Sequence, residues 1–415
     1  MSESLMQWLG AWGESALTAA GFFWKAGWAF VLGYGVSAMI QAFVPKGRLT
    51  PWMGKANVPS VAVGTLFGAI SSSCSFAALA TARALLTRGA HFVVAVAFMF
   101  ASTNLVIELG VLIWIFLGPG YVLAEIVGGL VLIAISATLV GLTMPQDWLE
   151  AARAHAESTT EDEPEDFDWR ERLRTLSGWS RVGDHFVMEW GMVWREITVG
   201  FTVAGFVATL VPESFWQFLF LSTGEAGRDA PFWVVLENAA VAPWVAAATF
   251  IGSMGNIPLA TVLAAGGVTF GGIMAFIYAD LMVPPLVKVN ARYYGWRVAI
   301  YLAGVMYVSM VTTALLLHYG LLMMEIDVSS TRRMDEVTRF KLDYTFWMNV
   351  VAVGVVGLML WLRSRGGEES GDDHEHDQEH DHEEDHDGGG VELQDIVTWL
   401  ALALVGGGLI ATAIV

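Results

Sequence analysis

Long apolar runs, separated by short polar connections, occupy most of the chain. Each run is near or above the roughly 20 apolar residues that cross a 30 Å hydrocarbon layer as a helix. In order they are Phe22–Val44, Pro59–Leu86, Phe92–Leu117, Tyr121–Met144, Gly191–Val211, Phe232–Ala264, Val268–Val287, Val298–Leu322, Phe346–Leu362 and Val397–Val415. Irregular backbone inside lipid would leave amide groups unpaired, so the runs predict helices and not strands. We therefore expect an all-α polytopic membrane protein with about ten transmembrane helices.

Four apolar side chains precede the first run at helical spacing, Leu5, Trp8, Leu9 and Trp12. Tryptophan is typical of the headgroup level of a bilayer, so this stretch predicts a short interfacial helix. A frayed N-terminal tail is the alternative.

Four short blocks of sequence recur in the same order in the two halves of the chain. Ser73–Ser75 matches Ser253–Gly255, Ala78–Thr81 matches Pro258–Thr261, Gly89–Phe92 matches Gly267–Phe270, and Ala97–Ser102 matches Ala275–Asp280, at offsets of 178 to 180 residues. This order predicts an internal duplication, a common design of secondary transporters whose binding site lies between the repeats. If the long runs Pro59–Leu86 and Phe232–Ala264 both cross fully, the repeat is parallel. If both are re-entrant hairpins, it is inverted.

The predicted organisation follows from the runs and from the polar segments between them. A first transmembrane repeat takes residues 1–144, an acidic hydrophilic loop 145–190, a second transmembrane repeat 191–324, a connecting loop and ninth helix 325–365, a His/Asp/Glu-rich disordered loop 366–392, and a C-terminal transmembrane helix 393–415.

Charge is concentrated outside the apolar runs. Only 15% of the residues are Asp, Glu, Lys or Arg, compared with about 25% in soluble domains. The net charge of −19 comes from Pro145–Trp190, with 12 acidic and 5 basic residues, and from Glu368–Glu392, with 13 acidic and no basic residues. The rest of the chain has a net charge of +1. This composition excludes a soluble enzyme, and the acidic surface argues against nucleic acid as a partner.

A polar segment interrupts an apolar run in each half of the chain. The first contains Ser71, Ser72, Ser73, Cys74 and Ser75, and the second contains Ser253, Met254, Asn256 and Pro258. Proline removes a helical amide donor, and paired breaks at corresponding positions point to a transport site. We expect the two segments to meet and bind the solute, with the serines and Asn256 supplying hydrogen bonds. A packing seam whose hydroxyls bond to their own helices is the alternative.

Cys74 is the single cysteine of the chain, which excludes a disulfide framework and a cysteine-based zinc cluster. In the repeat it aligns with Met254. Both sulfurs are soft ligands, suited to Cu(I) or another thiophilic metal or metalloid. Ordinary core packing is the alternative, because free Cys is commonly a small buried hydrophobe and Met a flexible gap filler.

Carboxylates within apolar runs are the candidates for coupling. Asn104 and Glu108 share one helix face at a spacing of four, and Asn104 is a further solute-binding candidate. Asp280 lies in the matching region of the second half. A carboxylate inside the membrane is costly unless it is paired or faces a polar cavity. Glu108 or Asp280 would couple a proton or balance charge, whereas an ion pair with Arg83 or Arg88 would be structural.

A histidine tract lies in the second acidic segment. His374, His376, His380, His382 and His386 are interleaved with Asp and Glu. Imidazole and carboxylate together bind Zn, Ni or Cu ions loosely when no fixed geometry is imposed. The tract is therefore either a metal-buffering loop or a plain solvated linker.

The residues around the two breaks resemble the arsenical-permease-like family of predicted inner-membrane permeases. The likeness rests on Ser73-Cys74-Ser75, Leu85-Leu-Thr-Arg-Gly-Ala90, Phe98-Met-Phe-Ala-Ser-Thr-Asn104 and Gly252-Ser-Met-Gly-Asn-Ile-Pro-Leu259, and it covers most of Leu17–His318. It implies an efflux permease for organoarsenicals or soft metals. The sequence departs from the family where a Cys-x-Cys pair is typical, because the first position is Ser72, and Ala77 and Ala78 stand where a proline usually follows.

Together these features predict a multi-pass permease of the inner membrane that exports a soft metal or metalloid by alternating access, without ATP or a cofactor. Its partners would be membrane lipid and the solute, and a homo-oligomer is compatible with the sequence. A membrane metal-binding or assembly protein that uses the His tract is one alternative. A permease for an unrelated organic solute is another.

Overall fold

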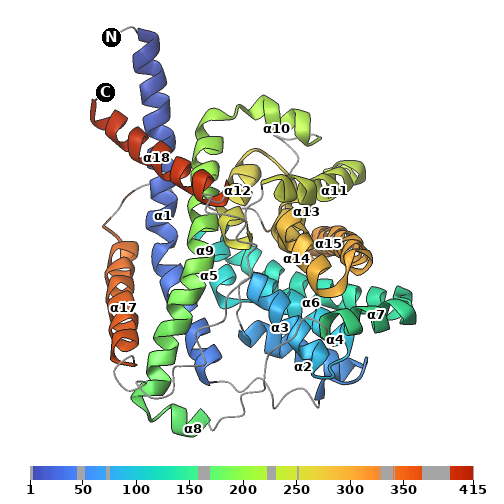
Figure 1. Ribbon diagram of the computed structural model, residues 1–415. Coiled ribbons are helices and arrows are strands. Elements are labelled where there is room, and N and C mark those ends of the chain that lie inside the picture. Colours follow the sequence, from blue (N-terminus) through green and yellow to red (C-terminus); the bar gives the residue numbers. More distant parts are fainter. Residues whose placement is uncertain are drawn as a thin grey trace.

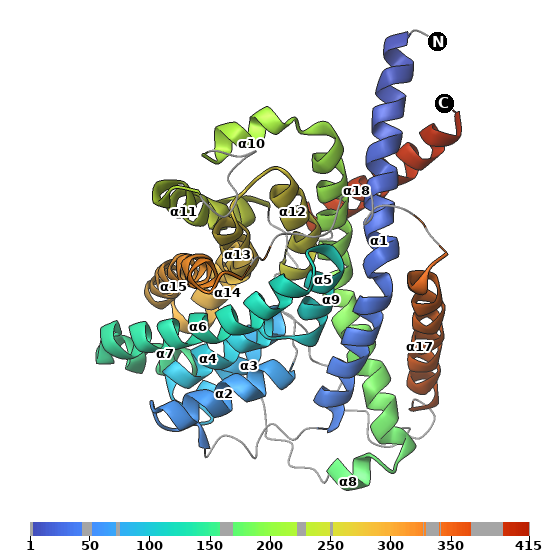
Figure 2. The same cartoon turned by 180° about the vertical axis from the view of Figure 1, so that it is seen from behind.

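The protein is described from a computed structural model that covers residues 3–43, 52–71, 75–157, 169–221, 230–249, 252–326, 328, 340, 342–366 and 393–414. Within these ranges every regular element is a helix, as the apolar runs predict. Figures 1 and 2 show the helices from opposite sides.

Two long helices form one side of the molecule. α1 spans Glu3–Phe43 and α9 spans Leu176–Leu210, and they pack along one another. α1 descends in Figure 1 while α9 rises, so the two are antiparallel. Between them, buried Glu189 accepts a hydrogen bond from the Ser37 hydroxyl at 2.8 Å.

The N-terminal stretch, expected to be a short interfacial helix, is helical and continues without a break into the first apolar run, because residues 3–43 form one helix. The Trp12 indole donates to the Leu404 carbonyl at 2.9 Å, in α18 (Leu393–Ile414), which crosses α1. A tertiary contact with the C-terminal helix therefore holds this tryptophan.

The remaining core helices form two units with the same order of elements. The first unit is α2 (Val58–Ser71), α3 (Ser75–Thr87), α4 (Phe92–Asn104), α5 (Ile107–Phe116) and α6 (Pro119–Thr143). The second is α11 (Phe232–Thr249), α12 (Ser253–Ala265), α13 (Phe270–Tyr278) with the 3-10 turn η3 (Ala279–Met282), α14 (Pro284–Tyr294) and α15 (Trp296–Met323). α1 leads into the first unit, and α9 leads into the second through α10 (Glu213–Leu219).

Two pairs of glycines with positive φ mark equivalent turns in the two units. Gly89 (φ +95°) follows α3 and Gly267 (φ +85°) follows α12, while Gly118 (φ +103°) precedes α6 and Gly295 (φ +83°) precedes α15. Glycine adopts these angles without the steric penalty that other residues meet. The pairs are 178 and 177 residues apart, close to the offset of the sequence blocks. The duplication thus extends to the backbone conformation of the turns.

The two units also contact one another reciprocally. α5 packs on α12, and α14, the counterpart of α5, packs on α3, the counterpart of α12. α6 and α15 pack on each other. Reciprocal contacts of this kind are typical of repeats related by a pseudo-two-fold axis. Because α1 and α9 enter the two units in opposite directions, the arrangement corresponds to the inverted scheme.

In the described part of the chain, four further helices surround this core. α7 (Gln146–Glu157) packs on α14 and α3, and α8 (Trp169–Arg172) precedes α9. The range 145–190, expected to be a hydrophilic loop, therefore contains α7, α8 and the first part of α9. α17 (Tyr344–Gly366) packs on α9 and α1, and α18 packs on the same two helices. Each of these two C-terminal helices forms an ion pair with the long helices. Asp343, just before α17, pairs with Lys25 of α1 at 3.0 Å, and Asp395 of α18 pairs with Arg195 of α9 at 2.9 Å.

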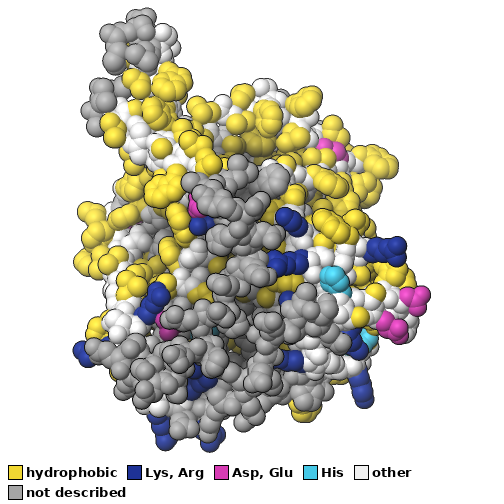
Figure 3. All heavy atoms as spheres, viewed as in Figure 1, with side chains coloured by type: hydrophobic (Ala, Val, Ile, Leu, Met, Phe, Trp, Pro, Cys, Tyr) yellow, Lys and Arg dark blue, Asp and Glu magenta, His cyan; other side chains and the backbone are white. Residues whose placement is uncertain are grey.

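The described residues contain eight helical segments that are long and apolar enough to cross a membrane, with α4 and α5 counted together as Phe92–Phe116, or nine if the bent pair of α13–η3 and α14 counts as one span. The count differs from ten because Pro59–Leu86 folds as the two shorter helices α2 and α3, whereas Phe232–Ala264 still contributes one candidate span, α11. Apolar side chains cover the upper part of the face in Figure 3, and most Lys and Arg side chains lie in its lower half. The chain is a multi-pass membrane protein.

Candidate functional site

Asp280 joins the starts of two helices that belong to different units. Its Oδ2 accepts a hydrogen bond from the Ser75 hydroxyl at 2.5 Å, and its Oδ1 accepts one from the Ser253 backbone N–H at 2.9 Å. Ser75 is the first residue of α3, and Ser253 is the first residue of α12. Asp280 itself is only 1% exposed. One buried carboxylate therefore connects the two breaks that the sequence singles out.

A break in a third helix places Asp280 at this position. α13 ends at Tyr278, and the chain continues through the tighter turn η3, which contains Asp280. Pro284 begins α14 after a bend of 44°. Proline cannot continue α13, because it lacks the amide donor and its ring clashes with the preceding turn. The carboxylate consequently lies where the helical hydrogen-bond ladder stops.

Glu196 of α9 brings a second carboxylate to the same place. A Cβ added to Gly252 would lie 2.2 Å from Oε2 of Glu196, so the glycine leaves the space that this carboxylate occupies. Glu196 is also close enough to Asp280 for their negative charges to interact. α9 packs along α12, which fixes Glu196 beside the segment Gly252–Ser253.

The site thus combines two carboxylates with two helix N-termini. The N-terminal ends of α3 and α12 carry partial positive charge, which favours an anionic group beside them. Two carboxylates that share one site do not both stay ionised unless a cation lies between them; otherwise one of them holds a proton. The arrangement can therefore hold a cation or exchange a proton while a solute passes.

Three of the residues singled out from the sequence meet at this point, namely Ser75, Ser253 and Asp280. Asn256 is 1% exposed and accepts a hydrogen bond from the Thr249 hydroxyl at 3.2 Å, which links the end of α11 to α12. Met254 is partly buried in the second position of α12. Ser71 is buried in the last position of α2. Ser72, Ser73 and Cys74 lie outside the described residues.

Pro258 does not form the break in the second unit. α12 begins at Ser253, and Pro258 lies inside it. Its missing N–H leaves the carbonyl of Met254 without the usual helical hydrogen bond from that position. The helix continues across the proline, and the change of direction comes earlier, before Ser253.

Glu108 and Asn104 lie in another part of the first unit. The Glu108 side chain packs against Gly33 of α1, where an added Cβ would lie 1.9 Å from its Cγ. Asn104 ends α4 and lines a pocket between α5 and α6. Arg83, considered as an ionic partner for Glu108, donates to the Ala156 carbonyl at 3.3 Å and lies over the Tyr293 ring at 4.9 Å.

Two carboxylates were missed from the sequence, Glu196 and Glu125. Glu196 follows Arg195 near the start of an apolar run, which resembles a charged membrane boundary. The structure instead places it well inside α9, because that helix begins at Leu176. Glu125 stands alone in the run Tyr121–Met144. The signal that could have found both is a carboxylate within an apolar run, the same signal that marks Asp280.

Fixed metal centres are not evident in the part of the chain that the structure describes, where no three His, Cys, Asp or Glu side chains converge on one point. The histidine tract, His374, His376, His380, His382 and His386, lies outside the described residues.

Comparisons with known proteins agree with this architecture. Residues 12–319 match a family described as predicted permease, of the ArsP type. The chain is 35% identical over 331 residues to the protein named "Putative permease Rv2963" of Mycobacterium tuberculosis, and the match covers 76% of this chain and 79% of that protein. No solved structure gives a significant match. The matched family range begins in α1 and ends in α15, so it contains α1, α9 and both five-helix units.

Proposed function

Because the chain belongs to the ArsP-type family of predicted permeases, we propose that it moves a small solute by ATP-independent alternating access through a site centred on Asp280. One observation carries the proposal: the starts of two broken helices, one from each unit, meet at a buried carboxylate. Secondary transporters with inverted repeats bind their solutes at such discontinuous helices, near the middle of the membrane.

The two hydrogen bonds of Asp280 have different roles in this mechanism. The bond to Ser253 lies within the second unit, whereas the bond to Ser75 crosses from the second unit to the first. When one unit moves against the other, the bond to Ser253 can persist, and the bond to Ser75 has to break. A solute or proton that binds Asp280 competes with the Ser75 hydroxyl and so favours the rearrangement.

Glu196 would balance charge during this step. With both carboxylates ionised, their repulsion favours binding of a cation or a proton, and release restores the repulsion. Asp280 is thus the coupling group that we favour, and Glu196 is its partner. Glu108, packed against α1 at Gly33, remains a second coupling candidate.

The proposed solute is a soft metal or metalloid species, and the direction is efflux. Cys74 directly precedes Ser75 in the chain, and Met254 directly follows Ser253, so a sulfur residue adjoins each residue that binds Asp280. Thiolate and thioether sulfur favour thiophilic ions, and the nearby carboxylates would offset a positive charge. The serines, with Asn256, would supply hydrogen bonds to oxygen ligands of the solute.

Everted membrane vesicles test the solute class. We expect vesicles that contain the protein to accumulate arsenite, a trivalent organoarsenical or Cu(I), and we expect Cys74→Ala to reduce the accumulation at least tenfold. Met254→Leu, which keeps the volume but removes the sulfur, should weaken it severalfold. Unchanged accumulation of every transported solute by Cys74→Ala would remove the sulfur-based assignment. That result would not affect the proposal that the protein is a permease, which the flux of Asp280 variants tests separately.

The histidine tract is proposed to buffer divalent metal ions beside the permease and to have no part in the transport step. Deletion of Gly371–Gly388 should therefore leave the flux at saturating solute unchanged. Loss of all activity on deletion would instead support a metal-delivery protein that works through the tract.

A further inference from the structure

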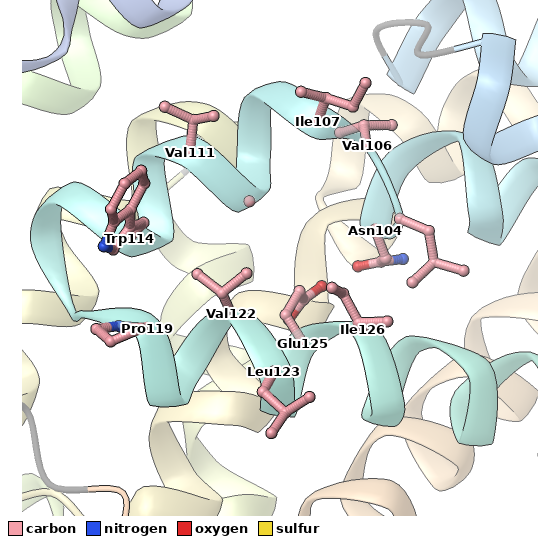
Figure 4. Close-up of a pocket in the computed structure, with 12 residues that line it drawn as sticks. Asn104, Val106, Ile107, Val111, Trp114, Pro119, Val122, Leu123, Glu125 and Ile126 are labelled. Carbon is pink, nitrogen blue, oxygen red and sulfur yellow. The ribbon is translucent and has the colours of Figure 1, made fainter.

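A second site lies between α5 and α6, at a pocket of about 520 Å³ (Figure 4). Its lining residues fall between 104 and 126, so they come from the first unit. The rim residues Ile107, Trp114, Leu123 and Ile126 are each at least half exposed. Large apolar side chains exposed on membrane-spanning helices face hydrocarbon. The pocket therefore opens toward the bilayer.

Two residues that line this pocket, Asn104 and Glu125, carry buried hydrogen-bond acceptors. Glu125 is 2% exposed, and neither of its carboxylate oxygens has a hydrogen-bond partner within the described structure; the same holds for Oδ1 of Asn104. The Asn104 amide nitrogen donates instead to the Phe100 carbonyl at 3.1 Å and to the Thr103 hydroxyl at 3.2 Å. Figure 4 shows the Asn104 and Glu125 side chains directed toward one another.

The nearby hydroxyl of Tyr278 does not donate a hydrogen bond to Glu125 or Asn104. Tyr278 of α13 approaches α6 at Gly128, where an added Cβ would lie 2.1 Å from the phenol oxygen. Its hydroxyl donates to the Ala124 carbonyl at 3.3 Å. The lining residues include no Lys, Arg or His. Three buried acceptor oxygens without a partner therefore belong to residues that line the pocket, and no Lys, Arg or His lies among those residues.

The second unit shows that the fold does not require these polar groups. With the offsets of the paired turns, Asn104 corresponds to Met282 and Glu125 corresponds to Leu302. Both counterparts are buried, at 8% and 1% exposed. An apolar residue thus suffices at each position, although a buried acceptor without a partner is unfavourable. The acceptors are a feature of the first unit alone, which is typical of a ligand site rather than of a packing requirement.

We propose that this pocket binds an amphipathic primary ammonium ligand that enters from the bilayer. An ammonium group carries three N–H donors, which match the two Glu125 oxygens and Oδ1 of Asn104. Its positive charge neutralises the buried carboxylate, and its apolar body lies against Val111, Trp114 and Val122. An anionic ligand is excluded by the carboxylate, and a purely apolar one leaves all three acceptors unpaired.

Direct binding to the full-length protein in phosphatidylcholine nanodiscs tests the proposal. The probe is dansylcadaverine, a primary ammonium on an apolar dansyl body, followed by its fluorescence. We expect saturable binding to the wild-type protein that dodecylammonium displaces and dodecanol does not. The N-acetylated probe, which is neutral, should bind at least tenfold more weakly.

Variants that carry the residues of the second unit provide the structural control. Glu125→Leu should weaken dansylcadaverine binding at least tenfold, and Asn104→Met should weaken it severalfold. The unfolding temperature of Glu125→Leu should stay at or above that of the wild type. If Glu125→Leu does not fold, Glu125→Gln, which keeps the side-chain shape but removes the negative charge, tests the role of that charge. Equal affinity of the wild type and Glu125→Gln, equal affinity for the neutral probe, or no saturable binding by the wild type would each overturn the proposal.

Discussion

The hydroxyl oxygen of Ser75 and Oδ2 of Asp280 lie 2.5 Å apart, although 205 positions separate the two residues in the chain. Ser75 opens α3 of the first unit, and Asp280 lies in the turn that ends α13 of the second. This hydrogen bond therefore crosses between the duplicated halves of the protein. Because the same carboxylate also holds the start of α12, it couples three helix termini at once.

Removing the Asp280 carboxylate should destabilise the protein. Asp280→Ala leaves the partly buried Ser75 hydroxyl and Ser253 amide without their acceptor, at up to about 1–3 kcal/mol for each group. Asp280→Asn keeps one acceptor oxygen and should recover part of the loss. Thermal unfolding of the purified protein measures the effect. An Asp280→Ala protein as stable as the wild type would show that the two bonds do not hold the breaks together.

Gly252→Ala should impair transport more than stability. The new Cβ would lie 2.2 Å from Oε2 of Glu196, so the carboxylate has to move, and the end of a glutamate side chain can do so at modest cost. We expect the flux to fall at least tenfold while the protein remains folded. Gly191→Ala, on the same helix as Glu196 and with no atom within 4 Å of the added Cβ, is the matched control and should retain its flux. Equal flux in the two variants would argue against a role for the Glu196 position.

The turn at Gly295 predicts that alanine substitution there destabilises the protein, whereas alanine substitution at Gly304, nine residues further along, does not. Gly295 has φ +83° and ψ 154°, a region that almost only glycine adopts, and no atom lies near an added Cβ, so Gly295→Ala should destabilise by about 1–3 kcal/mol through backbone strain alone. Gly304, inside α15, is equally free of contacts, and Gly304→Ala should be neutral or stabilising by up to about 1 kcal/mol. Chemical or thermal unfolding of both variants gives the comparison. A Gly295→Ala protein as stable as Gly304→Ala would contradict the assigned turn.

The cap of α4 should make stability depend on pH. Burial, with the nearby positive charge of Arg153, holds the pKa of His91 below its ordinary value. Nδ1 of the neutral ring accepts the Val93 amide at 3.3 Å. As the pH falls, His91 therefore binds a proton in the unfolded chain at a higher pH than in the folded protein. The stabilising contribution of neutral His91 is complete above the pKa of His91 in the unfolded chain. It is lost as the pH falls through the pKa of His91 in the folded protein.

His91→Thr provides the control for this effect. In the second unit Thr269 occupies the corresponding position and caps α13 with its hydroxyl, which does not titrate in this range. Between pH 7.5 and pH 5.5 the unfolding temperature of the wild type should fall more than that of His91→Thr. Equal decreases in the two proteins would exclude His91 as the source.

Polar residues within apolar runs allowed much of the site to be predicted from the sequence. Ser75, Ser253 and Asp280 stand out because polar groups are expensive in lipid, and the repeat aligned their regions. The partnership with Glu196 was not predictable, since Arg195 beside it resembles a membrane boundary and the length of α9 is set by packing against α1. The prediction that the helix breaks at Pro258 is wrong, because α12 continues through this proline. A helix can contain a proline when the surrounding contacts stabilise it.

The orientation of the repeat also required the structure. Hydropathy gives the lengths of Pro59–Leu86 and Phe232–Ala264 but not whether each folds back. The antiparallel course of α1 and α9 identifies the inverted scheme, which the sequence alone did not distinguish from the parallel one.

The most direct test of the account is flux through Asp280→Asn in everted vesicles, measured with any solute that the wild-type protein transports. Gly191→Ala is measured beside it, and both variants are compared at equal amounts of folded protein. If Asp280 lies at the centre of the transport site, Asp280→Asn reduces the initial rate at least tenfold and Gly191→Ala does not change it. A rate for Asp280→Asn within twofold of the wild type would contradict the central claim.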